Sequence, residues 1–148
     1  MPRLSRFTGT RFLCAEPPAG FGIRFYVADD KSVYAHTTFG DSKEGGAGIL
    51  HGGAISAVLD EAMGTACYEA HSAGYTATMT YHFASHIPLH QEVTIRAWVN
   101  KIDGKKMYSQ CSATLADGTV AVTGEGLLIA SASLHKMIVS NPYIPENE

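Results

Sequence analysis

Two hydrophobic repeats along the chain predict one long helix followed by a set of strands. Between residues 55 and 67 apolar side chains recur every three or four positions, which is typical of one face of an α-helix. This helix is expected to run from about Gly53 to about Ala70, roughly 27 Å at 1.5 Å per residue. Its remaining surface is small or apolar except for two adjacent acids, Asp60 and Glu61. Such a helix is expected to be surrounded by other structure.

The period changes to two after Tyr75, which indicates strands with one buried face. In residues 75–83 the two alternating sets are Thr76, Thr78, Thr80 and His82, and Ala77, Met79, Tyr81 and Phe83. In residues 92–100 the inward set is expected to be Val93, Ile95, Ala97 and Val99. Runs at 107–115 and 119–130, with Asp-Gly pairs at 103–104 and 117–118, complete an antiparallel meander. An earlier hairpin is expected from residues 22–28 and 32–38.

One apolar helix and about six strands predict an α+β fold, in which a strongly curved antiparallel sheet wraps around the helix. The 148 residues, of which 45% are hydrophobic and 17% charged, are expected to form a single domain. Residues 1–40 are the less certain N-terminal part of that domain. Residues 141–148, "NPYIPENE", are expected to be a solvated tail.

Charge and cysteine content exclude several classes of partner. The formal net charge is −3 and the basic residues are scattered, so neither a nucleic acid nor an anionic membrane is expected as a partner. Cys14, Cys67 and Cys111 are odd in number and far apart, which favours reduced thiols packed in a core. The N-terminus lacks the apolar run of a signal peptide, and no segment approaches the length of a membrane span. These features predict a cytoplasmic protein.

The sequence His51-Gly52-Gly53 lies where a loop becomes the long helix. Free backbone N–H groups and the positive end of the helix dipole point outward at such a place, which makes it a candidate oxyanion site. A glycine at position 52 allows a ligand carbonyl to approach the main chain, and Gly53 is assigned to substrate binding at the same turn. His51 is either a hydrogen-bond donor positioned at the helix entrance or a proton-transfer group. The alternative for the whole segment is a flexible loop that ends in an unusual cap.

Asp60 is the candidate general base or nucleophile. It lies about 140° around the helix from Ile55, at the margin of the apolar stripe, whereas Glu61 lies at about 240°. The alternative is a carboxylate satisfied by structural hydrogen bonds. Eight residues of helix, about 12 Å, separate Gly52 from Asp60, so one chain cannot bring both to the same carbonyl. If both act on one group, they come from different protomers of an obligate symmetric dimer.

The segment "GILHGG", followed by Asp60 nine residues after the histidine, resembles the hot-dog-fold acyl-CoA thioesterases. The pattern is that of the phenylacetyl-CoA thioesterase and human thioesterase superfamily member types, and it extends over about residues 44–130. The resemblance implies a curved sheet around a helix, dimers or tetramers, and a thioester held between protomers. It also implies that the Gly52 N–H polarises the thioester carbonyl and that Asp60 attacks it or activates water. His51 matches the motif histidine, and Thr76 matches the Ser or Thr that orients the water or the carboxylate.

The sequence departs from this pattern at Gly45, where some members of the family carry an Asn or Gln that contacts the carbonyl. Two lysines, Lys105 and Lys106, are candidate contacts for the phosphates of coenzyme A, although paired lysines on a turn are often only solvated. Trp98 is expected to face outward and is a candidate tetramer contact. Three histidines spaced by four, at positions 82, 86 and 90, are too far apart along a strand to share a metal ion.

The resulting hypothesis is hydrolysis of an acyl-CoA or aryl-CoA thioester, with no metal and with coenzyme A present only as part of the substrate. One alternative is a hot-dog hydratase or dehydratase, but the Asn-Pro-x-x-His-like stretch of those enzymes is absent from the sequence. A second alternative is a noncatalytic acyl-CoA binding protein. The sequence leaves the acyl group open.

Overall fold

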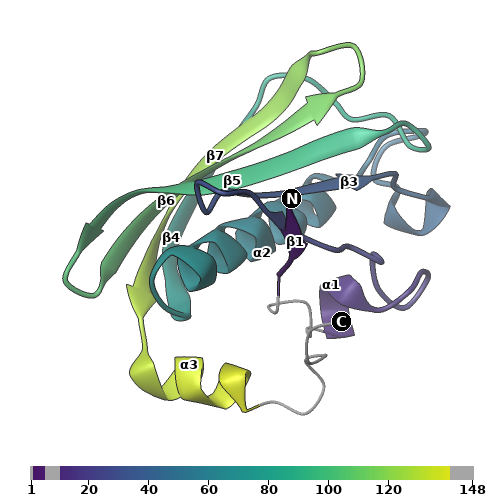
Figure 1. The fold of residues 1–148 in the computed structure, drawn as a ribbon. Coiled ribbons are helices and arrows are strands. Elements are labelled where there is room, and N and C mark those ends of the chain that lie inside the picture. Colours follow the sequence, from purple (N-terminus) through teal and green to yellow (C-terminus); the bar gives the residue numbers. More distant parts are fainter. Residues whose placement is uncertain (1, 6–10, 141–148) are drawn as a thin grey trace.

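The computed structural model of the chain contains a seven-stranded antiparallel sheet that curls around one long helix (Figure 1). The structure describes residues 2–5 and 11–140. The strand order is β1-β2-β3-β5-β6-β7-β4. The strands are β1 (Arg3–Leu4), β2 (Tyr26–Val27), β3 (Val33–Thr37), β4 (Gly74–Phe83), β5 (Val93–Asp103), β6 (Lys106–Leu115) and β7 (Val120–Ala130). The helices are α1 (Arg11–Cys14), the short 3₁₀ helix η1 (Asp41–Lys43), α2 (Gly52–Ala70) and α3 (Ala132–Val139).

Helix α2 is the predicted apolar helix and begins at Gly52, one residue before the expected start. Helix α2 lies on the concave side of the sheet (Figure 1). Its apolar stripe belongs to one buried core with the inward side chains of β5, β6 and β7. Burying this stripe against the sheet stabilises the fold, because apolar burial is worth about 25 cal/mol per Å². None of the helices among the described residues is long and apolar enough to span a bilayer.

The β5–β6–β7 meander is confirmed, and both predicted hairpin glycines, Gly104 and Gly118, have positive φ values of 58° and 88°. The prediction was wrong for β4, which pairs with β7 at the edge of the sheet rather than with β5. Residues 84–92 do not turn back on β4. They follow the segment before α2 instead, where Leu50 donates its N–H to the carbonyl of Ile87 at 2.9 Å.

A β-bulge in β4 changes the faces predicted for its first residues. Thr76 lies opposite the buried Leu128, whereas Thr78 lies opposite Leu127, so the strand uses two residues where β7 uses one. The extra residue, Ala77, reverses the alternation at this point. Thr76 therefore faces the helix, and its predicted grouping with Thr78 on one face was wrong.

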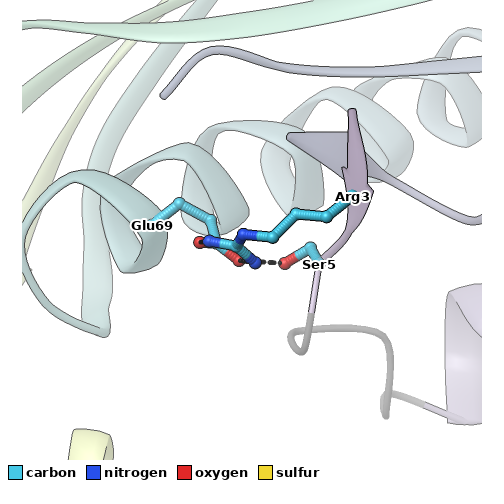
Figure 2. Close-up of polar contacts among 3 residues, drawn as sticks. All are labelled: Arg3, Ser5 and Glu69. Atoms are coloured by element: carbon cyan, nitrogen blue, oxygen red, sulfur yellow. Dashed lines mark hydrogen bonds and ion pairs between the residues drawn. The ribbon is translucent and has the colours of Figure 1, made fainter. Parts of the chain in front are cut away.

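The N-terminal residues form an integral part of the domain and extend one edge of the sheet through β1, β2 and β3. This part includes the expected early hairpin, with a shorter first strand than predicted. Glu69, near the end of α2, receives hydrogen bonds from Arg3 and Ser5, and the Arg3 contact is also an ion pair (Figure 2). The Glu69 side chain is only 5% exposed. These contacts hold the first strand against the helix.

Helix α3 was not predicted, and the "NPYIPENE" segment lies outside the described residues. Ser131 caps α3 by accepting the N–H of Leu134, and His135 accepts the N–H of Ala73 at 3.0 Å. The His135 ring also stacks on Tyr68. The helix is therefore attached at the C-terminal end of α2. The cysteines at positions 14, 67 and 111 are free and buried, as expected.

Candidate active site at the start of the central helix

The start of α2 explains why two glycines follow the histidine. His51 is the N-cap residue, and its ring nitrogen Nδ1 accepts the N–H of Gly53 at 2.8 Å. A side chain at position 53 would place its Cβ 3.0 Å from Nδ1 and Cε1 of that ring. Glycine at position 53 therefore leaves room for the imidazole to cap the helix.

Gly52 provides the backbone donor that remains available. The N–H of Gly53 is used by the His51 ring, and those of Ala54 and Ile55 bond to the His51 carbonyl. The N–H of Gly52 has no hydrogen-bond partner among the described residues. A Cβ at position 52 would have only Phe83 nearby, at 3.9 Å, so the position is open to a ligand. A free N–H at a helix N-terminus is a suitable donor to a carbonyl oxygen that becomes negative.

The cap also defines how His51 can act. A neutral imidazole carries one proton, so a ring that accepts a hydrogen bond at Nδ1 holds its proton on Nε2. One predicted role was that of a positioned hydrogen-bond donor, whereas in this cap the ring is the acceptor, and only Nε2 is left to donate. The cap leaves Nδ1 unavailable as a base, because that nitrogen is occupied by Gly53.

Asp60 and Thr76 meet as the resemblance implied. The hydroxyl of Thr76 donates to Oδ1 of Asp60 at 2.8 Å. Asp60 is half-buried, and the bulge in β4 is what directs Thr76 toward it. One carboxylate oxygen is thus held by the strand, and the acceptor capacity of the other remains.

One chain does not bring the two halves of the candidate site together. Gly52, Ser56 and Asp60 follow one another at intervals of four along the same side of α2, so Gly52 and Asp60 are about 12 Å apart along the axis. Each chain therefore carries a donor half and an acid half that face the same side at different heights. Neither half is complete for a reaction at one carbonyl.

A mainly apolar groove of about 430 Å³ opens beside Gly52. Its apolar lining comes from the segment before α2, from α2 and from the ends of β4 and β7, and includes Ile49, Leu50, Ile55, Phe83, Ile87 and Val122. Ser85 and His86 contribute polar groups. This groove was not predicted from the sequence, because its lining comes from segments far apart along the chain.

Several other predicted residues lie away from this groove. Lys105 and Lys106 are in the β5–β6 hairpin, which lies beside the end of β7 and therefore near the C-terminal end of α2. His86 lines the groove, whereas His82 lies in a hollow with Trp98, and His90 bonds to Asp41 at 2.6 Å. The structure thus places the three regularly spaced histidines in different surroundings, and only His82 lies in a strand.

Position 45 cannot supply a second carbonyl contact. A Cβ on Gly45 would lie 2.8 Å from the Cα of His51, so a side chain there would collide with the backbone of the capping residue. The buried cysteines are also unsuited to be nucleophiles. Burial raises the pKa of both Cys67 and Cys111 to about 12, which keeps these thiols protonated at neutral pH.

The sequence model of the Thioesterase superfamily matches residues 47–122, a span that runs from the segment before α2 into β7 and contains Gly52, Asp60 and Thr76. The chain belongs to the thioesterase superfamily. It is 30% identical over 108 residues to acyl-coenzyme A thioesterase THEM5 of Mus musculus, which covers 72% of this chain and 43% of that protein. It is 28% identical over 101 residues to acyl-coenzyme A thioesterase THEM4 of Bos taurus, covering 66% of this chain and 41% of that protein. The chain thus spans about two fifths of these relatives.

Solved structures of this superfamily share the fold. A thioesterase superfamily protein aligns with a TM-score of 0.77 and 26% identity, over 86% of this chain and 66% of that one. The PaaI protein of E. coli, from the phenylacetic acid degradation operon, aligns with a TM-score of 0.70 and 17% identity, over 76% of this chain and 81% of that one. A hypothetical thioesterase protein of Streptococcus pneumoniae, solved with coenzyme A, aligns with a TM-score of 0.65 and 16% identity. The alignment covers 68% of this chain and 81% of that one. The superfamily chain described here therefore has the predicted α+β hot-dog fold.

Proposed function

We propose that this member of the thioesterase superfamily hydrolyses acyl-CoA or aryl-CoA thioesters to a free acid and coenzyme A. The observation that carries the proposal is the pair formed by an open Gly52 N–H and an Asp60 carboxylate held by Thr76. The first stabilises an oxyanion, and the second acts as a general base or nucleophile. The apolar groove beside Gly52 accommodates the acyl group. Coenzyme A belongs to the substrate, and the proposed mechanism includes no further cofactor.

The proposed site lies between two copies of the chain. Strand β4, of ten residues, pairs only with β7 among the described residues, and it exposes three large apolar side chains, those of Tyr75, Met79 and Phe83. A long apolar edge is a template for pairing with another chain. A symmetric pair along this edge, with the two α2 helices antiparallel, brings Gly52 of each protomer toward Asp60 of its partner. Trp98, which is half-buried, remains a candidate contact for a further dimer-to-dimer association.

In the proposed reaction the thioester carbonyl oxygen accepts the Gly52 N–H. Asp60 of the facing protomer either removes a proton from water, which adds to the carbonyl carbon, or adds to that carbon itself. The negative charge that develops on the oxygen is stabilised by the N–H and by the positive end of the α2 dipole. The carbon–sulfur bond then breaks and the thiolate of coenzyme A takes up a proton. If Asp60 is the nucleophile, water cleaves the resulting anhydride and regenerates the carboxylate.

Relatives support this choice of substrate. THEM4 and THEM5 are acyl-coenzyme A thioesterases, and the Streptococcus pneumoniae protein has been solved with coenzyme A. That protein has also been solved as aspartate-to-alanine and threonine-to-alanine mutants at positions separated by the same number of residues as Asp60 and Thr76. Lys105 and Lys106 remain proposed contacts for the phosphates. Because they lie far from Gly52 of their own chain, they would act across the dimer. Free, buried cysteines support a cytoplasmic location.

Release of free coenzyme A from a panel of acyl and aryl thioesters tests the proposed reaction. Asp60→Asn should lower kcat at least ~10²-fold while the fold and the oligomeric state remain those of the wild type. Glu61→Gln is the matched control, because it removes the neighbouring charge on the same helix. A hydratase would alter the acyl group without releasing coenzyme A. Tight binding of the esters without turnover would support the noncatalytic binding protein and reject the hydrolase.

A further inference from the structure

Tyr81 contacts the turn of α2 that carries Asp60. Its hydroxyl donates to the backbone carbonyl of Ser56 at 3.2 Å. In an α-helix the same carbonyl accepts the N–H of the residue four positions later, which here is Asp60. The strand β4 is therefore bonded, through Tyr81, to the peptide group that accepts the Asp60 N–H.

The Tyr81 ring packs in a specific position on the inner side of the sheet. Tyr81 lies opposite Gly124 of β7. A Cβ at position 124 would lie 2.5 Å from the Tyr81 ring and 2.8 Å from Sγ of Cys111. Glycine at position 124 thus leaves the space that the aromatic ring fills. The direction of the Tyr81 side chain toward α2 is determined by packing as well as by its hydrogen bond.

The bulge in β4 is what brings Tyr81 and Thr76 to the same side. The two residues are five positions apart, and an odd separation in a regular strand places side chains on opposite faces. The two-for-one step between Thr76 and Thr78 reverses the alternation once, so both hydroxyls face α2. One edge strand therefore supplies a donor to the Asp60 carboxylate and a second donor to the Asp60 turn.

The surroundings of Tyr81 keep its hydroxyl in the donor form. Burial raises the pKa of Tyr81 above its usual range, and the proximity of Cys111 and Asp60 raises it further. A phenol that stays protonated donates to the helix throughout the neutral pH range.

We propose that Tyr81 is a positioning residue of the hydrolytic site: it holds the helical turn that carries Asp60, while Thr76 holds the carboxylate itself. This inference rests on the function proposed above. Thr76 occupies Oδ1, so fixing the turn keeps Oδ2 directed at the water or the thioester carbon. Tyr81 acts through Asp60 and does not exchange a proton with the substrate.

The steady-state kinetics of Tyr81→Phe test this role, because the variant keeps the packed ring and removes only the hydroxyl. We expect kcat to fall about 10-fold with an unchanged KM, the loss that corresponds to one hydrogen bond. In an Asp60→Asn background the same substitution should lower the residual rate no further, because the group it positions is gone. Tyr108→Phe is the matched control, since that ring lies against Lys101, on a strand that is not bonded to the Asp60 turn. If Tyr81→Phe lowers the rate of the Asp60→Asn variant by the same factor as it lowers the wild-type rate, the proposal is overturned.

Amide hydrogen exchange gives a readout that does not depend on turnover. Tyr81→Phe should speed exchange in residues 57–61 and leave the capped turn at residues 53–55 unchanged, whereas Tyr108→Phe should change neither. If residues 57–61 exchange as slowly in the Tyr81→Phe variant as in the wild type, Tyr81 is not a positioning residue. If the wild type releases no coenzyme A but exchange responds as expected, the hydrolytic function fails while the support of the Asp60 turn by Tyr81 stands.

Discussion

Two adjacent glycines at the start of α2 have different physical roles. Gly53 is small so that the His51 ring can accept its N–H, whereas the open space beside Gly52 leaves its own N–H accessible to the proposed ligand. The two glycines look equivalent in the sequence, but Gly53 is needed for the helix cap, whereas Gly52 is the proposed hydrogen-bond donor to the ligand. The distinction allows each role to be removed without the other.

Gly52→Pro should remove the oxyanion donor without breaking the helix. Position 52 is the first residue of α2, where proline is tolerated, and His51 before it has the extended backbone that a following proline requires, with ψ at 132°. We expect kcat for thioester hydrolysis to fall ~10²–10³-fold in Gly52→Pro. Gly52→Ala keeps the N–H, so it should retain far more activity than Gly52→Pro, although its methyl group lies beside the approaching ligand. Equal rates in the two variants would show that the N–H is not the donor.

The buried thiols link stability to pH in a predictable direction. Burial raises the pKa of Cys111 from 9.0 to about 12, so between those values the unfolded chain releases a proton that the folded chain keeps. The free energy of unfolding should therefore be unaffected by this thiol below pH 9 and should fall as the pH rises above it. Urea midpoints at pH 8 and pH 10 measure the effect. Cys111→Ala should show a smaller drop between these pH values than the wild type, and an equal drop would contradict the assignment.

At the scale of elements, the first strand is held to the central helix by one carboxylate. Glu69 lies at the C-terminal end of α2, where the helix dipole disfavours a negative charge, and Arg3 and Ser5 compensate for it (Figure 2). This contact joins residues more than sixty positions apart. Together with the pairing of β1, β2 and β3 in the sheet, it joins the N-terminal part to the fold.

Arg3→Met should destabilise the protein by roughly 1.5–3 kcal/mol, because it removes both guanidinium donors from a nearly buried carboxylate. Chemical denaturation measures the change, and the exposed Arg24, replaced in the same way, is the control for loss of a positive charge. A variant with both Arg3→Met and Glu69→Gln should recover part of the loss, since the unpaired charge is removed. Equal stability of Arg3→Met and wild type would mean that β1 is not held by this pair.

The elements themselves were predictable wherever a hydrophobic period extended over many residues. The helix from Gly52 to Ala70 and the strands β5, β6 and β7 follow directly from spacing and from two Asp-Gly turns. The bulge at Ala77 was not predictable, because a single inserted residue leaves no mark in an alternating pattern. That bulge turns Thr76 toward Asp60. The resemblance named both residues as candidates, but the physical reason for their contact was not predictable.

At the scale of the molecule, the edge position of β4 connects fold to function. A meander in sequence order would have buried β4 inside the sheet, whereas its place beside β7 leaves Tyr75, Met79 and Phe83 exposed along a free edge. The same edge carries Thr76 and adjoins Gly52. A second copy that pairs there would cover the apolar side chains and complete the site in one step.

Mixed dimers test the central claim, which is that one site uses Gly52 of one protomer and Asp60 of the other. A chain with Gly52→Pro and a chain with Asp60→Asn should each be nearly inactive alone, and their purified heterodimer should recover about one wild-type site out of two. Release of coenzyme A from the best ester of the panel is the readout. Recovery of about half the wild-type kcat is the predicted result. Heterodimers of verified composition that are no more active than either parent would contradict it and place both groups in a single chain.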